Sequence, residues 1–363
     1  MTVLKNAHFG REIFQVVSRE TIGLASEPPE DVRALVETQA AWMLLKDPPD
    51  HTRLRNLVHK AFTPRTVERL RIAVQQMTDQ ALDAALAHRD FDLIDALAYP
   101  IPVQVIAELL GVPEADHARL KEWSRGISPS LDFDNRHEIY VHASTATAAF
   151  YAYLQTLVEE RRKHPGDDLL SALVAAEAEG EHLSEHELLA TAMLLLVAGH
   201  ETTVNLIGNG TLALLRQRDQ WERITANPAL AKGAVEELLR FDSPVQLTAR
   251  WVLADTDMLG VPMRVGEQVT LLLGAANRDP ARFPSPSRLD ITRDASGHLA
   301  FGNGIHYCIG APLARLEGQI IFETLARRAP TLRLGEQAPV YRPTMTLRGL
   351  QSLPVTVRQA HAL

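Results

Sequence analysis

The sequence contains a single cysteine, Cys308, among its 363 residues. One cysteine excludes an intrachain disulfide, which fits a protein of a reducing compartment. Basic residues are not in excess either, because the formal net charge is −8 and the isoelectric point is near 6.0. A nucleic-acid-binding protein would carry a basic stripe or tail. We therefore expect no nucleic-acid partner, while a local basic face towards an acidic protein is compatible with this net charge.

The sequence also lacks an apolar run of transmembrane length. The longest such run, from Leu188 to Gly199, is followed directly by His200 and Glu201, and it is shorter than the roughly 20 residues that span a bilayer. The first five residues show no apolar stretch of a signal peptide. We therefore expect a cytoplasmic protein that has no membrane partner.

Helical patterns dominate what is present. Hydrophobic residues make up 46% of the chain, which is enough for a large core, and they recur with a 3.6-residue period between proline and glycine breaks. We find no internal repeat and no low-complexity linker. The sequence predicts one mainly α domain over residues 1–363, with small sheets at its margins. The predicted helices are 66–88, 102–111, 114–125, 140–163, 167–178, 185–216, 228–241 and 311–328, and the predicted strands are 251–253, 268–273 and 353–357.

One predicted helix is unusually long. Ser184 to Glu187 forms a capping-box pattern, and no proline follows before Pro228. A helix of about 30 residues is about 45 Å long, enough to cross the whole molecule. Its middle places Glu201 and Thr202 in an apolar segment, where a buried acid is costly unless it has a partner or a task. The pattern is compatible with a functional acid or with a hydrated kink.

The densest cluster of chemically informative residues runs from Phe301 to Gly310. Its glycines let the backbone turn tightly and approach a flat ligand closely. Cys308 falls just before the predicted helix 311–328, where amide hydrogens and the helix dipole favour a thiolate. A thiolate there can ligate haem iron, whereas most lone cysteines are inert buried thiols. The spacing of glycine, histidine and cysteine favours the interpretation that Cys308 is a ligand of haem iron.

This segment resembles the cysteine-ligand loop of the cytochrome P-450 superfamily. The family pattern Phe-Gly-x-Gly-x-His-x-Cys-x-Gly is matched at every fixed position. Ala198 to Thr202 resembles the family's oxygen-activating helix, Glu237 to Arg240 its Glu-x-x-Arg motif, and Pro284 to Arg288 the meander that follows. The resemblance runs from about Val3 to the C-terminus. It implies a mainly α, cytochrome P-450-type haem-thiolate fold with small peripheral β-sheets, and haem b as the cofactor.

The resemblance also implies roles for the matching residues. Cys308 would be the axial ligand of the iron, while Glu201 and Thr202 would organise the water that protonates the distal oxygen. Cationic and bidentate donors suit the two propionates of haem. The implied haem-binding residues are His51, Arg55, Arg250, Phe301, His306, Cys308 and Gly310.

A second implied group is structural. Glu237 and Arg240 are three residues apart and therefore share one helix face. By resemblance they form a buried charge network with Arg288 that holds the cysteine loop. A solvated surface pair is the common alternative for Glu-x-x-Arg in general.

The function that the resemblance implies is monooxygenation. One atom of dioxygen would enter a small apolar organic substrate by hydroxylation or epoxidation, and the other would be reduced to water. No reductase domain follows the haem domain, so the expected partners are a ferredoxin and a ferredoxin reductase. An acidic ferredoxin would dock near Arg53, Lys60 and Arg315. Candidate pocket residues, which could equally be core, are Leu194, Val197, Ala198, Gln246 and Leu247, with Val245 and Leu350 as weaker candidates.

Two other functions remain as alternatives. A peroxide-driven peroxygenase would need no acid–threonine relay, because peroxide brings its own protons. A non-catalytic haem carrier or sensor would not need an intact relay either. The substrate itself cannot be read from the sequence, since terpenoids, macrolides, fatty acyl groups and steroids all suit apolar pockets of this family.

Some features depart from the family pattern or mislead. The N-terminus is shorter than usual, so the first helix and some outer strands are expected to be abbreviated, and Leu289 replaces a frequent phenylalanine.

Two motif matches are misleading. The segment 208–213 matches a dinucleotide fingerprint but lies inside a predicted helix, which argues against dinucleotide binding. His182 and His186 have metal-ligand spacing, but they flank the capping residue Ser184, so we expect them to be solvated.

Overall fold

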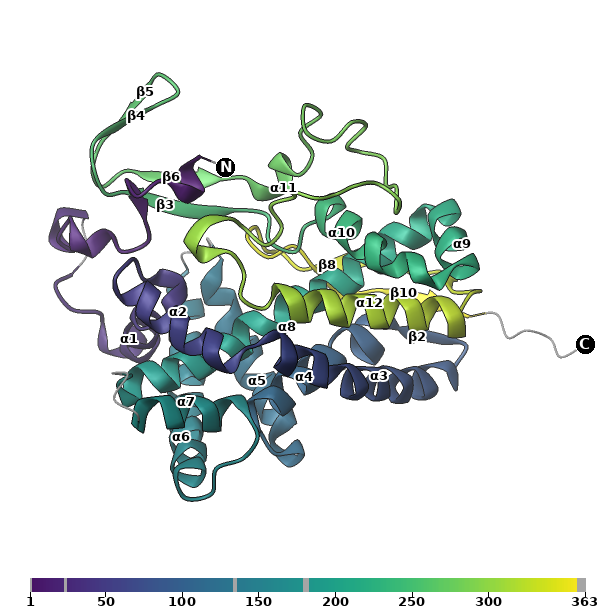
Figure 1. The fold of residues 1–363 in the computed structure, drawn as a ribbon, viewed down its shortest axis with the longest axis horizontal. Coiled ribbons are helices and arrows are strands. Elements are labelled where there is room, and N and C mark those ends of the chain that lie inside the picture. The colour runs from purple at the N-terminus through teal and green to yellow at the C-terminus, as the bar shows by residue number, and fades with distance from the viewer. Residues whose placement is uncertain (1, 23–24, 133–135, 179–182, 358–363) are drawn as a thin grey trace, which may run out of the picture.

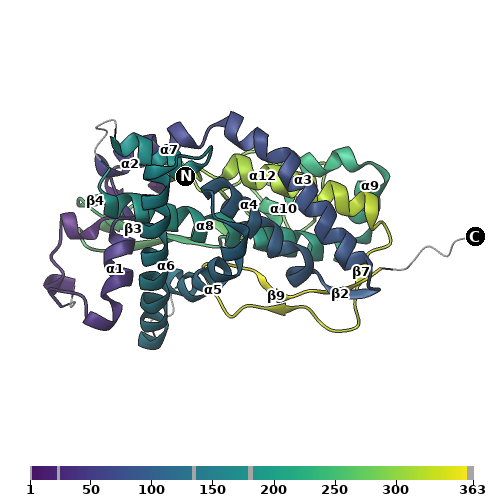
Figure 2. The same cartoon turned by 90° about the horizontal axis from the view of Figure 1, so that it is seen from below.

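The computed structural model describes residues 2–22, 25–132, 136–178 and 183–357 (Figure 1). The helix α8 (Glu185–Arg216) runs through the middle of the molecule in both views (Figure 1 and Figure 2). The predicted capping box is present, because the Ser184 hydroxyl accepts from the Glu187 amide and the Glu187 carboxylate accepts from the Ser184 amide. Almost all of α8 is buried, so the helix is the central element of the core.

The longer helices pack around α8. α4 (Pro100–Leu110), α6 (His137–Lys163), α10 (Ala231–Phe241) and α12 (Ala311–Arg328) each contact it, and α12 also packs against α3 (Pro64–Leu86). The remaining α-helices lie around this bundle. They are α1 (Arg33–Ala40), α2 (Asp50–Ala61), α5 (His117–Ile127), α7 (Leu169–Ala178), α9 (Arg218–Ala226) and α11 (Leu273–Ala276), with a π-helical turn η6 (Ile94–Ala98) before α4.

Glycines allow α8 to approach its neighbours closely. A Cβ atom on Gly208 would lie 2.7 Å from Ile94, and one on Gly210 would lie 2.7 Å from the Phe322 ring. The segment that matches a dinucleotide fingerprint thus lies within α8 and serves helix packing. This is the outcome that its helical context predicts.

Short antiparallel strands form small sheets at the margin. One sheet has the order β1 (Phe9–Gly10), β3 (Thr248–Val252) and β6 (Gln268–Leu271). Another has the order β2 (Asp90–Asp92), β10 (Pro354–Thr356) and β7 (Arg333–Leu334). The hairpin of β4 (Thr256–Met258) and β5 (Val261–Met263) projects from the body at the upper left of Figure 1. The last pair joins β8 (Val340–Tyr341) to β9 (Leu350–Ser352).

The mainly α architecture with small peripheral sheets is confirmed. The helices 185–216 and 311–328 have the predicted bounds, and the other predicted helices are present with shifted ends. The helices α1, α2, α9 and α11 were not among the predicted helices; each has 12 residues or fewer, so its helical period is short. Most strands were not predicted either, since two or three residues show no alternation. Leu289 is buried in the core, as its expected role requires.

Among the described residues, α8 alone has the length and apolar composition of a membrane span. Its most apolar window is 83% buried inside the protein. This burial is typical of the core helix of a globular protein.

Candidate functional site

The cysteine loop is the yellow-green segment that leads into α12 (Figure 1). Gly302 and Gly304 have φ values of 69° and 73°, a left-handed conformation that favours glycine. The Cys308 amide donates to the Phe301 carbonyl at 2.9 Å and thereby closes the loop. The short helix η10 (Gly304–His306) lies within it. Cys308 is placed directly before α12, as predicted.

Two opposing effects act on the Cys308 thiol. Burial raises its pKa above the ordinary value, while the amides of Gly310 and Ala311 and the charges of Arg55 and Arg315 lower it. The net direction is upward, which is opposite to the effect expected from the helix N-terminus alone, because the surrounding protein atoms disfavour the charged form. The residue nevertheless has exposed surface for a ligand to contact. Coordination to a metal cation deprotonates a thiol outright, so the site suits a thiolate only when a metal is bound.

A cluster of basic residues lies beside the loop. His51 of α2 and His306 of η10 have ring centres 4.3 Å apart, and His306 is close to Arg250 of β3. Burial and the charges of His51, Arg250, Arg11 and Arg55 lower the pKa of His306 to about 2. Burial and Arg250 lower the pKa of Arg11 to about 9. Burial is the largest cause of both shifts, and the neighbouring positive charges add to it.

This cluster fits the two propionates of haem. Among the described residues, Arg11 Nε, His51 Nδ1 and His306 Nε2 are buried without a hydrogen-bond partner. Asp47 is the nearby acid, but its Oδ2 already accepts from the amides of Arg11 and Glu12 at 2.7 and 2.8 Å. Buried nitrogen atoms without partners and nearby arginine side chains suit a pair of carboxylates.

Arg11 was not predicted from the sequence. The pairing of β1 with β3 places Gly10 opposite Trp251, and so brings Arg11 beside Arg250. A strand of two residues carries no sequence signal. The only hint was its basic side chain next to an apolar Phe-Gly pair.

Arg55 has a second role beyond the predicted one. Its Nη2 donates to the Tyr307 carbonyl at 2.6 Å. It therefore ties α2 to the cysteine loop, and a contact with a propionate stays a prediction.

Glu201 of α8 is buried and ion-paired. Its Oε2 lies 2.5 Å from Arg342 Nη1, and its Oε1 lies 3.6 Å from His200 Nε2. Burial alone would raise the pKa of Glu201, but His200 and Arg342 more than offset it and lower the pKa to about 2. His200 is itself fixed, since its Nε2 lies 3.1 Å from Ser124 Oγ and its Nδ1 2.8 Å from the Leu196 carbonyl.

Thr202 is placed differently from Glu201. Its hydroxyl donates to the Ala198 carbonyl at 3.3 Å, four residues back along the helix. Thr202 is half-buried and Ala198 is exposed, although the residues around them on α8 are buried. This face of α8 therefore carries an accessible hydroxyl, whereas the neighbouring acid is turned to Arg342.

The other pocket candidates are mostly enclosed. Leu194, Val197 and Leu247 are buried. The Gln246 side chain donates to the Ser243 carbonyl at 2.7 Å, and the Gln246 amide to the Thr346 carbonyl at 2.9 Å. Leu350 is buried next to Gly208 of α8, and Val245 is half-buried. Ala198 is the candidate with the most accessible surface.

The Glu-x-x-Arg network has a different third member from the one predicted. Glu237 and Arg240 are completely buried, and the guanidinium donates to both carboxylate oxygens at 2.7 and 2.8 Å. The third member is Arg293, whose Nε lies 3.2 Å from Glu237 Oε1. The prediction that Arg288 is the third member was wrong. Its side chain is exposed, and it contributes only a backbone carbonyl that accepts from Arg293. The irregular segment folds back at Ser285, with φ of 50°, so sequence position did not reveal which arginine points inward.

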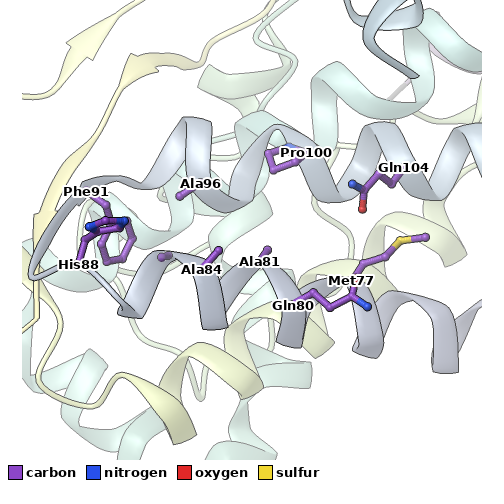
Figure 3. A pocket seen from close by; sticks show the side chains of 10 residues that line it. Met77, Gln80, Ala81, Ala84, His88, Phe91, Ala96, Pro100 and Gln104 are labelled. Carbon is purple, nitrogen blue, oxygen red and sulfur yellow. The ribbon is translucent and has the colours of Figure 1, made fainter. Parts of the chain in front are cut away.

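Two surface hollows lie outside this site. The pocket in Figure 3, of about 400 Å³, lies between α3 and the η6–α4 segment and contains none of the predicted site residues. A second hollow, of about 470 Å³, lies between α3, α10 and α12 and is lined in part by Arg71, Lys232, Glu236 and Arg315.

Of the two histidines with metal-ligand spacing, His182 lies outside the described residues. His186 Nδ1 lies 3.1 Å from the Tyr151 hydroxyl and Nε2 lies 3.3 Å from the Glu37 carbonyl, so the ring is hydrogen-bonded within the protein, and the expectation of a solvated side chain was wrong.

The comparisons with known proteins show the family of the chain. A family model described as Cytochrome P450 matches residues 13–329. The chain is 41% identical over 361 residues to "Polyketide biosynthesis cytochrome P450 PksS" of Bacillus subtilis, covering 98% of this chain and 86% of that protein. It is 47% identical over 335 residues to "Cytochrome P450 monooxygenase PikC" of Streptomyces venezuelae, covering 90% and 79%. Among solved structures, P450BioI in complex with a hexadec-9Z-enoic acid-ligated acyl carrier protein matches with a TM-score of 0.90 and 40% identity, covering 98% of this chain and 89% of that one.

Proposed function

The chain belongs to the cytochrome P450 family, and from that premise we propose that it is a ferredoxin-dependent monooxygenase of a small apolar substrate, with Cys308 as the ligand of the iron. Members of this family are oxidoreductases that carry haem b. The cofactor, when bound, supplies the activation of dioxygen. The observation that carries the proposal is the pairing of the cysteine loop with the basic cluster of His51, Arg250 and His306.

The chain's own residues would bind and orient the cofactor. Cys308 would donate the axial thiolate. The buried cations would hold the propionates, with Arg11 added to the set that the sequence suggested. Gly310 leaves space beside the thiolate, since a Cβ there would lie 3.9 Å from Sγ. Phe301 would keep the loop closed through its carbonyl.

Thr202 would hold a water near the reacting oxygen, and Glu201 would deliver the proton to it. An acid whose pKa is about 2 is a poor donor near neutral pH, because a relay works best when its pKa is close to the working pH. Glu201 would therefore act when its contact with Arg342 is loosened. A peroxygenase or a haem sensor has no use for such a relay, and this favours the monooxygenase.

The Thr202 assignment is tested by coupling. A Thr202→Ala protein should bind haem and substrate and still consume reduced nicotinamide, but more of the electrons should end in hydrogen peroxide. Proton-transfer groups typically accelerate a reaction by about 10²–10⁴-fold, so the amount of product formed per nicotinamide consumed should fall measurably. Wild-type coupling in the variant would show that Thr202 is structural.

Two relatives narrow the substrate class. PksS is named for polyketide biosynthesis, and the P450BioI structure contains an acyl carrier protein bearing a fatty acid. We infer that this chain hydroxylates or epoxidises an apolar molecule. Spectral shifts of the haem on binding should identify it from a compound library that includes carrier-bound acyl chains.

The ferredoxin would dock on the face where the cysteine loop approaches the surface. Arg53 is a weaker docking residue than the sequence suggested, because Glu187 and Asp50 pair with it at 2.5 and 3.1 Å. The side chain of Lys60 lies outside the described part of the chain. Arg315 borders the hollow between α3, α10 and α12. The protein would act in the cytoplasm as a single domain.

Spectroscopy and turnover together test the proposal. The reduced carbon monoxide complex should show the red-shifted band of a thiolate ligand, and Cys308→Ser should lose it. Turnover should need ferredoxin, reductase and dioxygen, and should fall with rising salt because charges are screened beyond about 8–10 Å. Equal or faster turnover with hydrogen peroxide would favour the peroxygenase, and no turnover with either would favour a carrier or sensor.

A further inference from the structure

Arg315 makes several contacts with the cysteine loop from within α12. Its Nε and Nη2 donate to Glu236 at 2.7 and 3.0 Å, and its Nη1 donates to the Tyr307 hydroxyl at 3.2 Å. Its guanidinium carbon lies 4.5 Å from the centre of the Phe301 ring. One side chain thus contacts both Phe301, whose carbonyl closes the loop, and Tyr307, which precedes Cys308.

Glu236 is held firmly in place for this contact. His298 Nδ1 accepts from the Ala300 amide at 3.1 Å, so the neutral ring carries its proton on Nε2, which lies 3.1 Å from Glu236 Oε2. Burial would raise the pKa of Glu236, but His298 and Arg315 lower it to about 2. The carboxylate therefore stays ionised and keeps the guanidinium fixed.

Glu236 and Glu237 are adjacent on α10 but serve different parts of the molecule. Glu237 binds Arg240 of its own helix and Arg293 of the irregular segment that follows Arg288. Glu236 holds Arg315 and, through it, the loop. The Tyr307 carbonyl is bound from the other side by Arg55 at 2.6 Å.

We propose that Arg315, held by Glu236, is a positioning residue that keeps the Cys308 loop in the geometry for binding iron. The proposal rests on the assignment of Cys308 as the ligand. An exposed ion pair usually contributes little to stability. This pair is bidentate and half-buried, and its arginine also stacks on Phe301 and binds Tyr307, so its removal frees the loop at two points.

The test uses the haem-loaded protein and four variants: Arg315→Gln, Glu236→Gln, Arg315→Lys and Arg71→Gln. Arg71 is the matched control, because it lines the same hollow but pairs with Glu68 of its own helix. The readout is the half-life of the red-shifted carbon monoxide band in mild denaturant. Circular dichroism follows global unfolding in the same solution.

Arg315→Gln and Glu236→Gln should shorten the half-life of the band by about tenfold, as expected for the loss of charge-assisted hydrogen bonds, before the helical signal changes. Arg315→Lys should restore part of it, and Arg71→Gln should match the wild type. A wild-type half-life in Arg315→Gln, or loss of the band together with the helical signal, would overturn the positioning role. Absence of the band in the wild type would overturn the ligand assignment itself, so the two failures are distinguishable.

Discussion

The charges on the two sides of the cysteine loop are arranged in opposite ways. On the α10 side, Arg240 and Arg293 share the carboxylate of Glu237, so each guanidinium contacts a negative charge. On the α2 side, the guanidiniums of Arg11 and Arg250 lie close to each other, and the acid near them, Asp47, is already bound by backbone amides. Cations that contact a carboxylate stabilise the fold, whereas buried cations without such a contact are costly until an anion binds. The comparison thus distinguishes arginines that are paired within the protein from arginines that could bind an anionic ligand.

The largest effect is expected from breaking the Glu237 network. Glu237→Ala leaves two buried cations without a counterion, and removal of one member of a buried ion pair costs about 3–5 kcal/mol. The variant should show this loss in the free energy of unfolding, measured with denaturant on the apoprotein, and should retain little haem. A loss below about 1 kcal/mol would show that the network is not structural.

The stability of the apoprotein should respond in the opposite sense when the basic cluster around Arg250 is changed. Arg250→Gln removes a buried cation from among like charges, so the apoprotein should be as stable as the wild type or more stable. Haem affinity should fall about ten- to hundredfold, because a charge-assisted contact with a carboxylate is lost. Apoprotein unfolding and haem transfer to apomyoglobin measure the two quantities. Parallel losses in both would contradict the difference between the two regions.

Glu201 offers a third arrangement, an acid between two basic partners. Its folded pKa is about 2, below the ordinary value near 4.5, so its contribution to stability is present above pH 4.5 and is lost as the pH falls towards 2. Arg342→Gln should remove part of this contribution, about 1–2 kcal/mol at pH 6, because His200 remains. The difference from the wild type should shrink as the pH falls towards 2. A difference that is independent of pH would show that Arg342 acts through packing.

The smallest effect is expected at Arg288. Arg288→Ala should change the free energy of unfolding by less than about 0.5 kcal/mol, as is usual for exposed side chains. Arg293→Ala should be clearly destabilising, because it contacts Glu237 and three backbone carbonyls. Equal effects of the two variants on the free energy of unfolding would show that Arg293 is not a member of the network.

Local patterns in the sequence determined the parts of the molecule whose conformation depends on near neighbours. The capping box at Ser184 was sufficient for the start of α8, and the absence of proline up to Pro228 allowed its length. The glycines at 302 and 304 have the left-handed φ that the loop needs, and Cys308 precedes α12 as its position indicated. Each of these features rests on residues only a few positions apart.

Only the tertiary structure decided which distant charges meet. Arg11 joins the basic cluster through the pairing of β1 with β3, and Arg342 reaches Glu201 from beside β8. Arg293 takes the place expected for Arg288, whose side chain is exposed. Spacing along a sequence predicts contacts within a helix, but contacts across irregular segments depend on the path of the whole chain. The same path sets burial, so the upward shift in the pKa of Cys308 and the downward shift in that of Glu201 could not be derived from residue types.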